Sequence, residues 1–217
     1  MSLSTPLNAR SMLCAMESLN KPLEEPFQEF LGSTICNAGE HARFLNMLSL
    51  LEHIGSRKIM LSQMHGTLTH EILKHLAEET RHAAFFKREA ERLAGVAMDG
   101  YADDETSCAA AARGYFGRLD SELSAKLPAA VHREAPYLWV SLIVELRAVW
   151  VYSRYQKALA RVGFPLSLTG VLADEDRHLS ALADRLGHVE SEIDHVLPSA
   201  SVGERSLFER LLLAMRR

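Results

Sequence analysis

Two seven-residue segments of the chain nearly repeat each other. Residues 76–82 read Leu-Ala-Glu-Glu-Thr-Arg-His, and residues 172–178 read Leu-Ala-Asp-Glu-Asp-Arg-His. In each segment a Glu precedes a His by three residues, so on a helix the two side chains lie one turn apart on one face. A lone Glu-x-x-His pair arises easily by chance, whereas the shared pattern Leu-Ala-acid-Glu-x-Arg-His does not. The repeat therefore predicts two helices that carry the same pair of chemical groups.

Both Glu/His pairs interrupt stripes of apolar residues that are expected to face a core. A carboxylate buried without a compensating charge is very costly, and a bound metal ion is the simplest source of that charge. The Glu79/His82 and Glu175/His178 pairs are therefore candidate metal ligands. The residues that share their faces are Ile72, His75, Leu76, Ala83 and Phe86 on the first helix, and Leu168, Val171, Leu172, Leu182 and Leu186 on the second.

Two further helices are expected to complete the site, each with a single acid on its apolar face. Glu40 is the only acid on the face that it forms with Phe44, Met47, Leu51 and Ile54. Glu145 is the only acid on the face that it forms with Leu138, Leu142, Val149 and Tyr152. Mixed carboxylate and imidazole ligands favour iron or manganese over zinc. The predicted ligands are Glu40, Glu79, His82, Glu145, Glu175 and His178.

The composition favours helix almost throughout the chain. Leu, Ala, Glu, Arg and Met are abundant, and apolar runs with a period of two are missing. Gly and Pro residues divide the chain into long helical pieces. The expected order is helix, short connection, helix, long crossover, helix, short connection, helix. This order is typical of an all-α four-helix bundle with one long crossover.

The boundaries of these helices follow from their caps and breakers. We expect an N-terminal helical extension over residues 1–33, the bundle over 34–187, and C-terminal accessory helices over 188–217. Within the extension, Pro22 and Pro26 are expected to break a short helix. The expected helices run from the Ser33/Thr34 cap to about 55 or a little beyond, from 62 or 67 to 93, over 105–125, from 128 or 136 to 162, and over 167–186, 189–196 and 202–215.

Composition and charge disfavour several classes of protein. The formal net charge of −4 argues against a general nucleic-acid-binding surface. Cys14, Cys36 and Cys108 have no Cys-x-x-Cys spacing, which favours a reducing, cytoplasmic compartment. The N-terminus has no signal-peptide pattern, and no apolar run reaches the roughly 20 residues that a membrane-spanning helix needs. We therefore expect a cytoplasmic protein without a membrane span.

The two motifs resemble those of the ferritin-like superfamily, in particular its oxygen-activating branch. That branch includes the ribonucleotide reductase small subunit, bacterial multicomponent monooxygenase hydroxylases and aldehyde-deformylating oxygenases. Asp174-Glu175-x-x-His178 matches their fourth helix and Glu78-Glu79-x-x-His82 their second, over about residues 34–187. The resemblance implies a di-iron oxygenase with a Glu4His2 site, in which manganese or a mixed pair could replace iron. It also implies O₂ as co-substrate, a small, apolar substrate and a separate electron donor.

The resemblance also implies roles for residues around the ligands. Asp174 and Glu78 are expected to accept the second ring N–H of His82 and His178 respectively. Tyr152 lies two turns after Glu145 and is expected to donate a proton or hydrogen bond near the metals.

Other functions stay open beside the oxygenase. Iron handling or peroxide reduction, as in ferritins and rubrerythrins, is one, although ferritins generally lack the second Glu-x-x-His and rubrerythrins usually carry a Glu where this chain has Ala148. A tRNA-modifying di-iron hydroxylase is another, but the acidic balance disfavours RNA. A third is a metal-stabilised interaction protein, whose terminal helix over 202–215 could pack on the bundle or form a homodimer contact.

Overall fold

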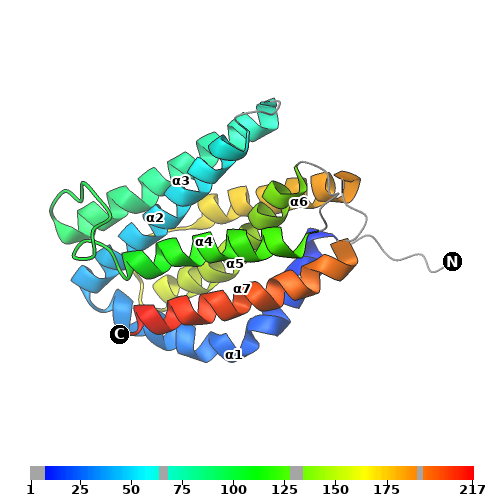
Figure 1. The fold of residues 1–217 in the computed structure, drawn as a ribbon. Coiled ribbons are helices and arrows are strands. Elements are labelled where there is room, and N and C mark those ends of the chain that lie inside the picture. The colour runs from blue at the N-terminus through cyan, green and yellow to red at the C-terminus, as the bar shows by residue number, and fades with distance from the viewer. Residues whose placement is uncertain (1–7, 64–67, 128–133, 190–192) are drawn as a thin grey trace. The chain divides into compact units, whose positions relative to one another are not determined.

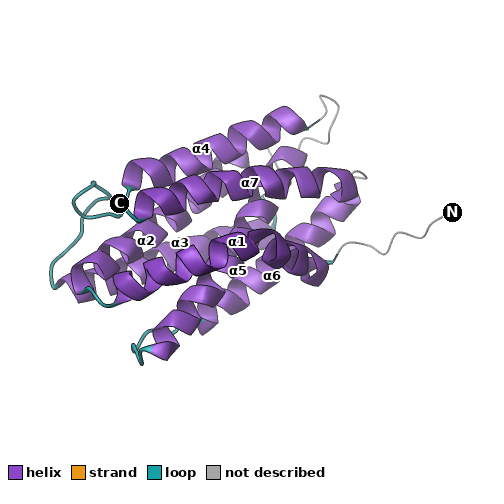
Figure 2. Ribbon diagram, turned by 90° about the horizontal axis from the view of Figure 1, so that it is seen from below, coloured by secondary structure: helices purple, strands orange, loops and turns teal. Residues whose placement is uncertain are grey.

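The computed structural model describes residues 8–63, 68–127, 134–189 and 193–217. Within these ranges all regular structure is helical and no strand occurs, as Figure 2 shows. The prediction of an all-α bundle fold is therefore confirmed. None of the helices in the described ranges has the length and apolar character needed to cross a membrane. In chain order (Figure 1) they are α1 (Ala9–Ile35), α2 (Ala38–Ser62), α3 (His70–Ala94), α4 (Ala109–Lys126), α5 (Ala135–Arg161), α6 (Thr169–Val189) and α7 (Ile193–Met215).

The chain divides into two compact units, each built around one pair of packed helices. The α2–α3 unit comprises residues 25–118 and 207–217, and its central pair is the α2–α3 hairpin. The α5–α6 unit comprises residues up to 24 together with 119–206, and α5 and α6 form its central pair. The ferritin-like pairing of the two hairpins stays a prediction, as does the division of the chain at residues 33 and 187.

Helix α1 runs without interruption through Pro22 and Pro26, so the expected break there is wrong. A proline inside a helix removes one amide donor and costs about 3 kcal/mol. Burial of the apolar stripe around the prolines offsets this cost. Phe27, for example, is fully buried and packs edge-on against Phe208 of α7 with ring centroids 5.9 Å apart.

Helix α7 is likewise continuous across the proline at which two separate helices were expected. Pro198 lies inside it, and the buried Leu197 and Ala200 flank that residue. Helix α6 also continues past Gly187, its expected end, to Val189. In α7 the local breaker is outweighed by apolar residues that a longer helix keeps in the core.

The capping residues set the helices of the α2–α3 hairpin. Helix α2 begins after Asn37, whose side-chain oxygen accepts from the backbone N–H of Gly39 and Glu40, so the expected cap at Ser33/Thr34 is wrong. Thr69 caps α3 by accepting from the N–H of Ile72 at 3.3 Å. Helix α3 ends where predicted, because Gly95 adopts a φ of 70° that favours glycine.

The connection between α5 and α6 folds back along α5. Gly163 follows the end of α5 with a φ of 65°, a conformation that favours glycine. Four residues after Phe164, the backbone N–H of Leu168 donates to Oε1 of Gln156 at 2.5 Å. This return along α5 moves the start of α6 toward the middle of α5. Glu145 therefore lies 18 residues before Gly163, whereas Glu175 lies only 12 residues after it.

The side chains of Asn46 and Lys87 hold the crossover after α3 against α2 and α3. Lys87 of α3 donates from Nζ to the carbonyl of Gly100 at 2.6 Å and to Oδ1 of Asn46 at 3.0 Å. Asn46 in turn donates to Oγ1 of Thr106 at 2.9 Å. Burial lowers the pKa of Lys87. The crossover is therefore a fixed part of the α2–α3 unit.

Candidate metal centre

The α2–α3 hairpin brings two carboxylates and one imidazole together in its core. Glu52 of α2 and Glu79 and His82 of α3 are all buried. Each offers a ligand atom, and these atoms lie within 4.8 Å of one another. The distance between Nδ1 of His82 and Oε2 of Glu52 is 4.0 Å. This buried Glu/His group could hold a metal ion.

A second histidine borders this group. Nε2 of His75 lies 3.3 Å from Oε1 of Glu79, one turn away on the same helix. His75 also offers a ligand atom within 4.8 Å of the one that Glu79 offers. The sequence places His75 on the Glu79 face, and the structure makes it a contact of that carboxylate.

Glu40, the acid predicted to complete this half of the site, lies elsewhere. It is in the first turn of α2, its side chain is 53% exposed, and Nη1 of Arg43 lies 3.4 Å from its Oε1. Twelve residues, or about 18 Å of helix, separate it from Glu52. The assignment of Glu40 as a ligand beside Glu79 and His82 is therefore wrong, and Glu52 takes its place.

Two sequence signals could have identified Glu52. It lies at heptad spacing from Leu45, Leu48 and Ile59, all of which are buried. It is also about as far before the connection between α2 and α3 as Glu79 is after it. In an antiparallel hairpin, residues equidistant from the turn lie at the same depth. The apolar face chosen for Glu40 misses this register because most faces of α2 are apolar.

The α5–α6 hairpin holds the corresponding set. Glu145 of α5 and Glu175 and His178 of α6 are all buried. Nδ1 of His178 lies 3.4 Å from Oε2 of Glu175 and 3.8 Å from Oε1 of Glu145. The structure therefore brings together the three predicted ligands of this half.

The acids that precede the ligand Glu in each repeat pair with the arginine three residues later. Arg177 donates two hydrogen bonds to Oδ1 of Asp174, and the one from its Nη1 has a length of 3.0 Å. The equivalent pair on α3 has Nη2 of Arg81 3.8 Å from Oε1 of Glu78. The repeated sequence thus produces a repeated ion pair. The predicted role of Asp174 and Glu78 as acceptors for the ligand histidines stays a prediction.

Tyr152 is buried on α5, seven residues beyond Glu145. On a helix this spacing returns the side chain to nearly the same face, about 10 Å along the axis. The placement agrees with the sequence, and its chemical role stays a prediction.

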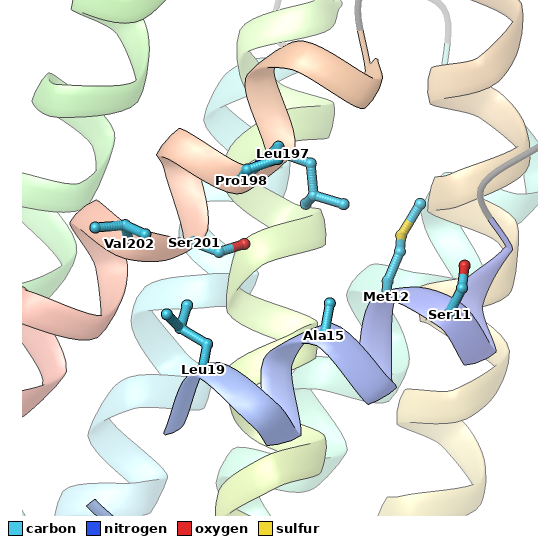
Figure 3. A pocket seen from close by; sticks show the side chains of 8 residues that line it. All are labelled: Ser11, Met12, Ala15, Leu19, Leu197, Pro198, Ser201 and Val202. Atoms are coloured by element: carbon cyan, nitrogen blue, oxygen red, sulfur yellow. The ribbon is translucent and has the colours of Figure 1, made fainter. Parts of the chain in front are cut away.

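A separate cavity in the α5–α6 unit has a different character. Figure 3 shows its lining, which comes from α1 and α7 and encloses about 370 Å³. Apart from two hydroxyl groups this lining is apolar, so it offers neither carboxylate nor imidazole to a metal. The lining residues are Ser11, Met12, Ala15, Leu19, Leu197, Pro198, Ser201 and Val202.

The chemistry of both hairpins fits a divalent metal. Two buried carboxylates a few ångströms apart repel each other, and a dication between them converts that repulsion into attraction. The donors are carboxylate oxygens and imidazole nitrogens, with no thiolate, which suits iron or manganese.

Comparisons with known proteins add no identification. No protein-family model matches the chain, and no curated protein or solved structure matches it significantly. The function must therefore be argued from the two Glu/His groups themselves.

Proposed function

We propose that this protein is a di-metal carboxylate oxidoreductase that uses O₂ to oxidise a small, apolar molecule. The main support for this proposal is an arrangement that occurs in both hairpins. Each hairpin buries a Glu-x-x-His pair next to a further Glu from the neighbouring helix. Since the same arrangement occurs twice, we infer that the two hairpins supply the ligands of one two-metal centre. The ligands are Glu52, Glu79, His82, Glu145, Glu175 and His178.

Two ferrous ions in this centre would supply the electrons that reduce O₂, and manganese could replace one or both. The four carboxylates would balance the four positive charges of two dications, so that the loaded core is neutral apart from its substrates. The imidazoles bind as neutral donors and add no charge.

The chain's other residues would position ligands and move protons. His75 contacts Glu79 at 3.3 Å, so a hydrogen bond between the two would fix the orientation of that carboxylate. Tyr152 would supply a phenolic proton from the α5 face that carries Glu145. Substrate oxidation with O₂ needs further electrons, which a separate donor protein would deliver.

The test is anaerobic titration with Fe(II) followed by exposure to O₂. We expect uptake of two ions per chain and a transient visible absorption band whose decay accelerates with an oxidisable substrate. Growth of a ferric mineral would contradict turnover and assign the chain to iron storage. Failure to bind iron would contradict the whole proposal. The matched control is Glu40→Gln, which removes an acid of α2 outside the Glu/His group and should leave uptake unchanged.

A further inference from the structure

The loop end of the α2–α3 hairpin exposes four large apolar side chains. Met60 and Leu61, in the last turn of α2, are each 58% exposed. Leu68 precedes α3 and is 54% exposed, and Leu73, in its first turn, is 48% exposed. Single exposed apolar residues are common, but here four lie within the few residues at one end of a hairpin. We call these four residues the tip patch.

The tip patch is not part of the hairpin's own core. Ile59 and Ile72 fill that core and are nearly fully buried. Met60 and Leu61 follow Ile59 by one and two residues, which turns them about 100° and 200° away from it on the helix. Leu73 is turned away from Ile72 in the same manner. These apolar side chains therefore face outward while the inward positions are already occupied.

The two segments that carry the tip patch are basic although the chain as a whole is acidic. The described residues 57–63 and 68–74 hold three basic residues, Arg57, Lys58 and Lys74, against the single acid Glu71. The formal charge of the whole chain is −4. Among the residues that the structure describes, no acidic side chain forms an ion pair with Arg57 or Lys74. Their charge is available to an external anion.

We propose that the tip patch docks the protein on an anionic lipid surface. Apolar side chains that enter the interface of a bilayer, flanked by cations that reach the headgroups, are the two components of peripheral membrane binding. A second copy of the chain is a poorer occupant, since it would bring the cations of both tips together. Docking at the tip and metal binding use different residues, so each stands or falls separately.

Flotation with vesicles tests this proposal. The full chain is mixed with vesicles of phosphatidylcholine alone, or of phosphatidylcholine and phosphatidylglycerol in equal parts. We expect flotation with the anionic vesicles and little with the neutral ones. Leu61→Ser should weaken binding to the anionic vesicles about tenfold. Replacing Arg57 and Lys74 by Gln should weaken it about fivefold for each cation, and added salt should reproduce that loss.

Matched variants separate the tip patch from general surface effects. Leu213→Ser removes a leucine that is 56% exposed on α7 and should not change flotation. Replacing the exposed Arg118 and Arg210 by Gln removes the same charge elsewhere in the same unit. Equal losses from tip and control variants would overturn the proposal, as would absence of flotation. Self-association that Leu61→Ser abolishes, in a chain that does not float, would assign the patch to a second copy instead.

Discussion

The α2–α3 and α5–α6 hairpins carry the same sequence motif but differ at two points. In the register of the repeat, His75 of α3 corresponds to Val171 of α6, so the first hairpin has an additional histidine one turn before its ligand Glu and the second has a valine there. The α2–α3 hairpin is also symmetric about its turn, with Glu52 and Glu79 at equal depth. The α5–α6 connection instead folds back to Gln156 before α6 begins.

These differences show that a repeated motif specifies the ligands but not their surroundings. In the α2–α3 hairpin, Glu52, Glu79 and His82 form one group and His75 adds a contact to Glu79, whereas the α5–α6 hairpin has Glu145, Glu175 and His178 alone among the described ligand candidates. We therefore expect two metal positions of unequal affinity, the tighter one in the α2–α3 hairpin.

The largest effect is expected where the α5–α6 unit is held by a buried ion pair. Arg147 of α5 donates two hydrogen bonds to Glu204 of α7, at 2.8 and 2.7 Å, and both residues are buried. Glu204→Ala leaves the guanidinium buried without that carboxylate and should lower the free energy of unfolding by about 3–5 kcal/mol. Chemical denaturation measures the loss, and hydrogen exchange should place it in α5 and in the part of α7 around Glu204. Glu209→Ala, at an exposed acid of the same helix, is the control.

The next effect tests the placement of Glu52. Glu52→Gln should weaken binding of Fe(II) or Mn(II) to the α2–α3 hairpin about a hundredfold, because the charge of a ligand is lost. Glu40→Gln should leave the affinity unchanged. Titration calorimetry under argon measures both. If Glu40→Gln produced the loss and Glu52→Gln did not, the sequence-based assignment would be right and the structural one wrong.

The two units should also respond differently to acid. Burial, with a smaller contribution from the nearby Arg92, lowers the pKa of His41 from its ordinary 6.5 to about 4. Because the unfolded chain then binds the proton first, stability falls as the pH drops from 6.5 toward 4, by about 2 kcal/mol at pH 5. In the α5–α6 unit, the hydrogen bond from Arg154 lowers the pKa of Glu17. The stability that Glu17 contributes is therefore lost only as the pH falls below the ordinary carboxyl range.

His41→Gln should remove the earlier of these two transitions. The measurement is the free energy of unfolding as a function of pH for both proteins. Parallel curves for the wild type and the variant between pH 6.5 and 4 would contradict the assignment to His41.

The smallest effect concerns the extra histidine. His75→Val makes α3 resemble α6 at this position and should lower the metal affinity of the α2–α3 hairpin about tenfold, the size of effect expected when a ligand's orienting partner is removed. The metal affinities of the two positions should then become more nearly equal. An unchanged difference between them would show that His75 neither binds the metal nor orients Glu79.

Much of the fold could be predicted from the sequence, because the repeat and the helical composition are local signals. The continuity of α1 through Pro22 and of α7 through Pro198 could not be predicted, since tertiary burial decides whether a helix tolerates a proline. The same holds for the start of α2, where Asn37 caps the helix rather than Ser33 or Thr34.

The ligands were easier to predict on helices with a single apolar face than on a helix that is buried on several faces. On α3 and α6 the Glu/His pairs stand out against one apolar stripe. On α2, buried residues such as Phe44, Leu45 and Met47 occupy several faces, so the inward acid could not be identified by its face alone. Symmetry about the connecting turn was the signal that distinguishes Glu52 from Glu40.

We propose that both hairpins supply one two-metal centre, and electron paramagnetic resonance of the Mn(II)-loaded protein distinguishes this centre from two separate sites. Two Mn(II) ions that share bridging carboxylates are magnetically coupled, whereas ions in separate sites give the spectrum of isolated Mn(II). We predict two ions per chain with a coupled spectrum, which Glu79→Ala and His178→Ala should each abolish. Two uncoupled ions, or coupling that survives either substitution, would contradict the claim.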